Sequence, residues 1–200
     1  MLFQKHVKYN SGGMAGHSKW AQIKRKKGIK DQEKGAIFTK LSKLISLAVS
    51  TGGGIANPDL NIKLQLAIER AKAANMPKDT IERAIQKGAG PGKDSLKEMI
   101  YEGFGPEGTG FIVHATTDNS NRTYAEVRMA FDKNGGKMGV PGSLQYLFKI
   151  EHSPEFMCTP MFPVEVKNEQ SAEEIVSLMS ALETLEDVQQ VFTNVEFNES

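Results

Sequence analysis

The sequence predicts an α+β protein in which a basic helical bundle precedes an acidic domain built on β-strands. Apolar residues recur at helical spacing up to about residue 90, and short segments rich in Ile, Val, Phe and Tyr replace that pattern from residue 99 onward. The charge changes at the same place. Residues 1–92 hold 17 Lys and Arg against 6 Asp and Glu, whereas residues 93–200 hold 8 against 18. This asymmetry predicts that one half meets a polyanion and that the other half has a different role.

We therefore divide the chain into an N-terminal extension (1–13), a basic helical bundle (14–90) and an acidic ferredoxin-like α+β domain (91–200). The extension is too short and too weakly amphipathic for an organelle presequence, and we expect it to be disordered. The glycines and the proline of segment 88–94 are typical of a linker. A phosphate-binding loop is not predicted there, because the glycine-to-lysine spacing is one residue short and no apolar strand precedes it.

The densest positive charge lies between Lys19 and Lys43, where nine basic residues stand against two acidic ones, a net charge of +7 in 25 residues. A solvated helix face normally carries acidic partners for i,i+4 pairs, and this segment has few. We interpret it as a surface for nucleic-acid phosphates. The predicted contact residues are Lys19, Lys24, Arg25, Lys26, Lys27, Lys30 and Lys34, joined by Arg122 from a polar run in the second half.

Four helices are predicted in the first half from their start and stop signals. The first begins at Ser18, and its Trp20 is expected to anchor a core rather than to stack on a base. The others are expected from Asp31 to Gly52, from Asn57 to about Ala71, and from Pro77 to Gly88. The third carries an apolar stripe that includes Leu60, Leu64, Ala67, Ile68 and Ala71.

The second half alternates extended segments with helices. After a strand at 99–104, the predicted order is a strand at 109–117, a helix capped near Asn119, a strand at 144–150, an extended segment at 156–166, a helix capped by Ser171 and a strand at 188–197. Strand, helix, strand, strand, helix, strand is the ferredoxin-like split βαβ arrangement, with the strand at 99–104 added. This fold hosts many functions and identifies none by itself.

Several classes of site are not predicted. The single Cys158 rules out an internal disulfide, and four scattered histidines have no metal-ligand spacing, so we expect no metal and no cofactor. No nucleophile elbow or spaced catalytic pair is present, and we expect no enzymatic activity. Glu186 and Asp187 are interpreted as solvated charges near a helix end. No apolar run reaches the ~18 residues of a membrane span, so we expect a soluble protein.

Seven segments, in order along the chain, resemble the YebC/PmpR family: MAGHSKWAQIK, IFTKL, AKAANMPKDTIERAIQKG, YEGFGPEG, TDNSNRTYAEVR, FDKNGGKMGVPGS and LEDVQQVFTNVEF. The resemblance runs from Met14 to about Phe197 and implies that Met14 is the natural start. It implies a basic helical N-terminal domain used on nucleic acid, with α+β domains behind it. Family members usually carry a third domain after the strand at 142–148, and here only residues 150–155 bridge to the next strand, so that domain is expected to be missing.

The resemblance implies a cytoplasmic, DNA-binding transcriptional regulator. For several relatives it implies instead a ribosome-associated translation factor that binds ribosomal RNA. Mitochondrial relatives activate translation of cytochrome oxidase subunit I, so a eukaryotic source would place the protein in the mitochondrial matrix. Beside these nucleic-acid partners, we expect the acidic half to face a protein partner or to shield the basic surface.

Overall fold

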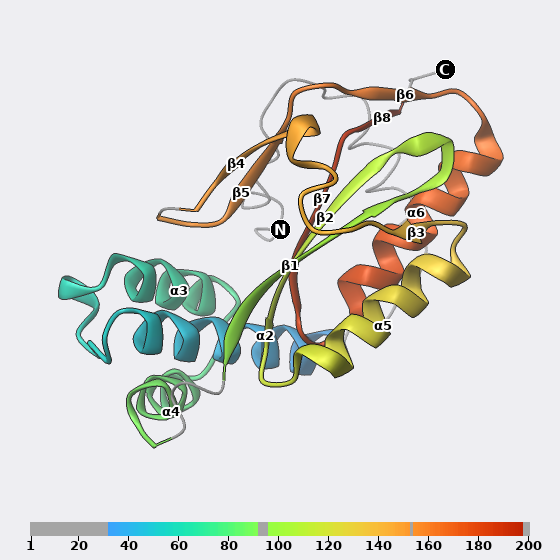
Figure 1. The fold of residues 1–200 in the computed structure, drawn as a ribbon. Helices are drawn as coiled ribbons and strands as arrows, with labels where there is room; N and C mark the ends of the chain where they lie inside the picture. Colours follow the sequence, from blue (N-terminus) through green and yellow to red (C-terminus); the bar gives the residue numbers. More distant parts are fainter. Residues whose placement is uncertain (1–31, 92–95, 153, 198–200) are drawn as a thin grey trace.

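The computed structural model describes residues 32–91, 96–152 and 154–197, and within them it has the predicted α+β architecture (Figure 1). The predicted first helix, with Trp20 and most of the basic run, lies outside the described residues.

The described helical part is a bundle of three α-helices and one short 3-10 turn. The elements are α2 (Gln32–Thr51), η1 (Pro58–Leu60), α3 (Ile62–Ala73) and α4 (Lys78–Ala89). Ile45 and Val49 of α2 pack against Leu64 of α3, and all three side chains are fully buried. The end of α2 just before Gly52 agrees with the prediction.

The third predicted helix is divided in the structure. The Asn57 side chain caps only η1, and α3 begins after Asn61, whose Oδ1 accepts a hydrogen bond from the backbone N–H of Leu64. Leu60 is consequently 73% exposed, and its predicted place in the apolar stripe is wrong. Asn61 also donates from Nδ2 to the carbonyl of Ala48, so its side chain ties the start of α3 to α2. One polar residue therefore caps a helix and joins two helices.

Gly88, the predicted stop of the last helix in the bundle, lies inside α4. A Cβ at this position would come within 2.5 Å of the carbonyl oxygen of Ser46 in α2. Ser46 in turn donates its hydroxyl to the carbonyl of Ala84. Gly88 is needed because the backbones of α2 and α4 approach closely there.

The main sheet has four strands in the order β3-β1-β2-β7, and all neighbours are antiparallel. The strands are β1 (Lys97–Phe104), β2 (Gly110–Thr117), β3 (Lys137–Met138) and β7 (Val188–Thr193). Helices α5 (Ser120–Lys133) and α6 (Glu169–Thr184) cover one face of it (Figure 1). Asn119 caps α5 as predicted, whereas α6 is capped by Asn168 and not by Ser171.

The opposite face of the sheet is covered by a separate two-stranded ribbon. Its strands are β4 (Phe148–Glu151), which follows the 3-10 turn η4 (Gln145–Leu147), and β5 (Met157–Pro160). Phe148 and Phe156 pack on Ile112 and Phe192 of the main sheet. A third small sheet pairs β6 (Val164–Val166) in parallel with β8 (Val195–Phe197).

The predicted order of strands and helices is present as β2, α5, β4, β5, α6 and β7. The pairing differs from a single ferredoxin-like sheet in more than one respect, because the predicted strand 188–197 is divided into β7 and β8 and only β7 joins the main sheet. Strand β1 pairs along the whole edge of β2, so the β4–β5 ribbon packs on the face of the sheet instead of extending it. Residues 145–147 form η4, which also makes the predicted strand 144–150 shorter than expected.

Candidate nucleic-acid interface

The structure describes two of the eight predicted contact residues. Lys34 is exposed in the first turns of α2, and Arg122 lies in the first turn of α5 with a side chain that is 43% exposed. No contact of the described residues joins the two. The other six, Lys19, Lys24, Arg25, Lys26, Lys27 and Lys30, lie outside the described residues.

Arg122 belongs to a cluster of charges centred on Asp187, which is 1% exposed and follows α6. The Arg122 guanidinium donates from Nη2 to Asp187 Oδ2 at 2.7 Å, and it also pairs with Asp118 at 3.0 Å. Lys43 of α2 donates to Asp187 Oδ1 at 2.6 Å. Thr117 and Thr123 donate their hydroxyls to Oδ2. Interpreting Asp187 as a solvated charge is therefore wrong, because the carboxylate is buried under four donors.

The cluster keeps Asp187 ionised. Burial opposes its charge, but hydrogen bonds from Arg122, Lys43 and Thr123 outweigh that effect and hold the pKa of the carboxyl well below its usual range. The same contacts raise the pKa of Arg122. For Lys43, burial lowers the pKa, and the hydrogen bonds to Asp187 and Glu186 raise it by more. Because Lys43 belongs to α2, this cluster also fastens the helical part to the sheet.

Further cations lie on α3 and α4, where no contact residue is predicted from the sequence. Lys63, Lys72 and Lys87 are exposed and have no ion-pair partner among the described residues. Their only sequence signal is the net charge of the first half, which does not distinguish exposed positions from paired ones. They add positive charge to the helical part beyond the predicted segment.

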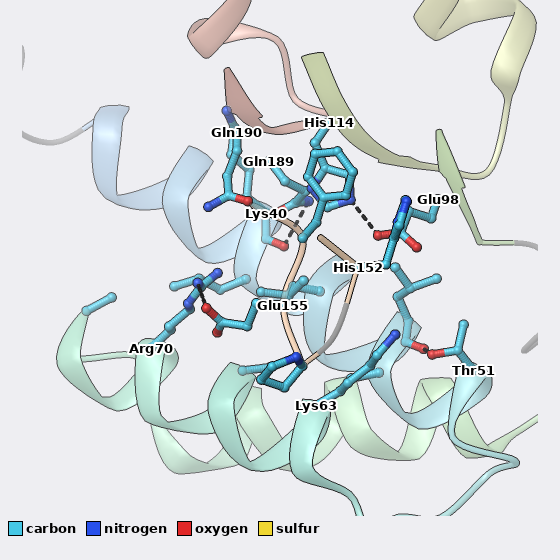
Figure 2. Close-up of a pocket in the computed structure, with 18 of the residues that line it drawn as sticks. Lys40, Thr51, Lys63, Arg70, Glu98, His114, His152, Glu155, Gln189 and Gln190 are labelled. Atoms are coloured by element: carbon cyan, nitrogen blue, oxygen red, sulfur yellow. Dashed lines mark hydrogen bonds and ion pairs between the residues drawn. The ribbon is translucent and has the colours of Figure 1, made fainter. Parts of the chain in front are cut away.

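A cavity of about 300 Å³ lies between α2, α3 and the main sheet, and Figure 2 shows the side chains around it. Leu41 and Leu44 of α2 line an apolar wall. Polar groups line the rest. Arg70 of α3 donates from Nη2 to Glu155 Oε2 at 2.5 Å on one side of the cavity. The sequence pattern indicates no shared role for these polar residues, since they come from six separate segments.

His114 of β2 is the most buried polar side chain that lines this cavity, at 4% exposure. Its Nε2 lies 2.7 Å from Oε1 of Glu98 on β1, and its ring stacks on Phe156 with centroids 4.4 Å apart. The hydrogen bond from His114 lowers the pKa of Glu98. An ionised carboxylate only accepts, so Nε2 carries the proton. Nδ1 is buried and has no hydrogen-bond partner among the described residues.

Two family profiles match the chain in succession. One is described as the TACO1/YebC protein N-terminal domain and matches residues 18–91, and the other as the TACO1/YebC second and third domain and matches residues 96–152. The chain belongs to the TACO1/YebC family. The boundary between the two profiles falls at the connection between α4 and β1.

Curated relatives share high identity with this chain. A protein of Caldanaerobacter subterraneus subsp. tengcongensis is 57% identical over 136 residues, which are 68% of this chain and 55% of that protein. A protein of Herpetosiphon aurantiacus is 52% identical over 139 residues, which are 69% of this chain and 54% of that protein. Both are named probable transcriptional regulatory proteins. The chain spans about half the length of these curated relatives.

A longer match shows that this chain differs in length from a relative. A probable transcriptional regulatory protein of Synechococcus sp. (strain JA-2-3B'a(2-13)) is 36% identical over 245 aligned positions, covering 94% of this chain and 98% of the relative. Since this chain has only 200 residues, the relative holds residues inside the matched span that this chain lacks. The expected absence of the third domain agrees with this finding. The crystal structure of a conserved hypothetical protein from Aquifex aeolicus has a TM-score of 0.80 at 34% identity, covering 91% of this chain and 98% of that chain.

Membrane spans and metal clusters are both absent from the part of the chain that the structure describes. No helix there is long and apolar enough to cross a membrane. Among the same residues, no group of three or more His, Cys, Asp or Glu side chains is arranged to hold a metal ion.

Proposed function

We propose that this chain is a cytoplasmic regulator of gene expression that binds DNA through its basic helical part. The single observation that carries the proposal is the charge distribution, a net charge of +11 in residues 1–92 against −10 in residues 93–200. Lys19, Lys24, Arg25, Lys26, Lys27, Lys30 and Lys34 contact phosphates, which gives affinity without sequence choice. Arg122 joins them from α5. Exposed lysines on α3 and α4 support a cationic surface that extends beyond this segment.

The names of the relatives support a regulatory role and no particular ligand. We propose that residues 14–90 act as the nucleic-acid domain, that residues 91–200 form the acidic domain, and that residues 1–13 are an extension outside both. The acidic domain faces a protein partner or shields the cations. Lys43 already pairs with Glu186 and Asp187, which supports shielding.

The first prediction tests the basic segment. Replacing Lys24, Arg25, Lys26 and Lys27 by Ala should lower the slope of log K against log salt by roughly 0.9 for each phosphate that is no longer neutralised, or about 3 to 4 in total. The measurement is titration of a labelled duplex at several salt concentrations. A comparison variant replaces four exposed cations of α3 and α4, Lys72, Lys78, Arg83 and Lys87, which lie outside the basic segment, and its slope should fall by less. A larger fall of the slope in the comparison variant would move the interface to α3 and α4.

Sedimentation of a cell lysate distinguishes DNA from ribosomal RNA as the ligand. A regulator that acts on DNA stays near the top of a sucrose gradient after the lysate is treated with DNase, which leaves ribosomal subunits intact. Co-sedimentation with ribosomal subunits, abolished by washing in high salt, would instead establish the translation factor that binds ribosomal RNA.

A further inference from the structure

Two consecutive glutamines of β7 both line the cavity. In the pairing of β2 with β7, His114 faces Gln190 and Ala115 faces Val188, so Gln189 is the extra residue of a β-bulge. Successive side chains of a regular strand point to opposite faces. A bulge re-aims one of them, and bulges are common beside functional sites. Figure 2 shows Gln189, Gln190 and His114 together at the sheet side of the cavity.

These side chains leave hydrogen-bonding capacity unused. His114 Nδ1 is buried without a partner among the described residues, and in the neutral ring that atom is an acceptor. The Gln190 amide makes no side-chain hydrogen bond to a described residue, and the Gln189 amide makes only a 3.4 Å bond to the carbonyl of Lys40. A buried polar atom without a partner is rare in folded proteins and calls for an explanation. A ligand that supplies a donor to Nδ1 would provide one.

The arrangement fits the edge and faces of a planar heterocycle. Residues opposite each other in antiparallel strands have Cβ atoms about 5 Å apart, which puts the side chains of His114 and Gln190 within reach of one ligand. Glutamine amides pair with the edge of a base. The apolar wall of α2 suits the faces of a ring. A volume of about 300 Å³ is at the small end for ligand sites and suits one base with its sugar better than a peptide strand.

We propose that this cavity binds a single nucleobase, delivered by a single-stranded nucleic acid or by a free nucleotide. Lys63 lines the same cavity from α3, is exposed and has no ion-pair partner among the described residues, so it is placed to meet the attached phosphate. Delivery by a nucleic acid rests on the function proposed above. Delivery by a free nucleotide does not.

The test uses the full chain and two probes, a single-stranded oligonucleotide with one 2-aminopurine and adenosine 5′-monophosphate. Gln190→Leu removes the amide, and Leu44→Phe narrows the cavity from the opposite wall. The matched control is Gln170→Leu, the same change on the exposed surface of α6. Insertion of the base into the cavity should raise 2-aminopurine fluorescence with the wild type and the control. With Gln190→Leu the rise should disappear, and affinity for the monophosphate should fall at least about fivefold.

The outcomes separate the two proposals. In one outcome, wild type and Gln190→Leu bind the oligonucleotide and an abasic analogue with equal affinity, and 2-aminopurine fluorescence does not change. The nucleobase site is then wrong, and nucleic-acid binding stands. If the monophosphate binds in a Gln190-dependent way and no oligonucleotide binds, the nucleobase site stands and the proposed function is wrong. A short peptide that binds where neither nucleotide probe does would assign the cavity to a protein partner and overturn the nucleobase site. Unchanged melting temperatures of both cavity variants identify the effects as local.

Discussion

At the scale of single residues, Asp187 shows how much a charge depends on its surroundings. Its neighbour Glu186 is the solvated surface charge that the sequence predicts, with a side chain 64% exposed. Asp187 differs because it directly precedes strand β7, where its carboxylate contacts side chains of α5 and α2. The pattern Glu-Asp after a helix cannot distinguish the two positions. The four donors, at positions 43, 117, 122 and 123, belong to α2, β2 and α5, which only the fold brings together.

Replacing Asp187 by Asn should destabilise the protein by about 3 kcal/mol at neutral pH, because Lys43 and Arg122 lose a shared carboxylate in a buried setting. The pKa of Asp187 is lowered in the folded state, so its contribution is complete above the unfolded pKa of about 3.9 and is lost as the pH falls below it. Urea unfolding of wild type and Asp187→Asn should therefore differ by a constant amount above about pH 5 and converge in stronger acid. A difference that does not depend on pH would show that the ionised form is not what stabilises the fold.

At the scale of elements, the sequence predicted most helices and strands of the described residues, and it failed where a boundary depends on tertiary contact. Asn57 and Pro58 are a strong helix start, yet the helix begins four residues later because Asn61 bonds both to α3 and to α2. The cavity was not predictable, since its polar wall requires a bulge in β7. A bulge leaves no pattern in the letters VQQVF.

The close contact of α2 with α4 leads to a further prediction. Gly88→Ala should destabilise the bundle by roughly 1 to 3 kcal/mol, because the new methyl group meets the Ser46 carbonyl at a distance that forces the helices apart. Gly35→Ala is the matched control, since a Cβ there meets nothing within 4 Å and alanine favours the helix by about 0.5 to 1 kcal/mol. Thermal unfolding should move in opposite directions for the two variants. Equal stabilisation by both would mean that α4 can shift to accommodate a side chain.

At the scale of the whole molecule, the two halves of opposite charge are joined along α2. Lys43 pairs with Glu186 and Asp187, and Lys40 donates to the carbonyl of Glu183 at 2.5 Å. The glycines and the proline of segment 88–94 predicted a linker between the halves. In the structure these contacts across 143 to 144 residues hold the helical part against the end of α6.

Removal of one exposed carboxylate, that of Glu186, tests whether the acidic half shields the cations of the helical part from a polyanion. Glu186→Gln should raise affinity for a polyanion at low salt by less than about fivefold, the limit for an exposed ion pair. The gain should shrink toward 0.15 M salt, where the Debye length is about 8 Å. Glu173→Gln makes the same change of net charge on an exposed turn of α6. If both variants gain equally, total charge is responsible and Glu186 has no local shielding role.

The β4–β5 ribbon has a geometry that suits the insertion of extra residues, of which the longer relatives hold many. Glu151 and Met157 face each other as paired residues, and the second family profile ends at residue 152. Paired residues of antiparallel strands have Cα atoms about 5 Å apart. The strands can therefore accept an inserted domain, provided that the domain's two termini lie close together. The backbone pairs of the ribbon are the same with and without the insertion. We expect the longer relatives to carry their extra residues between these two strands, where a whole domain can be added or removed without a change in the main sheet.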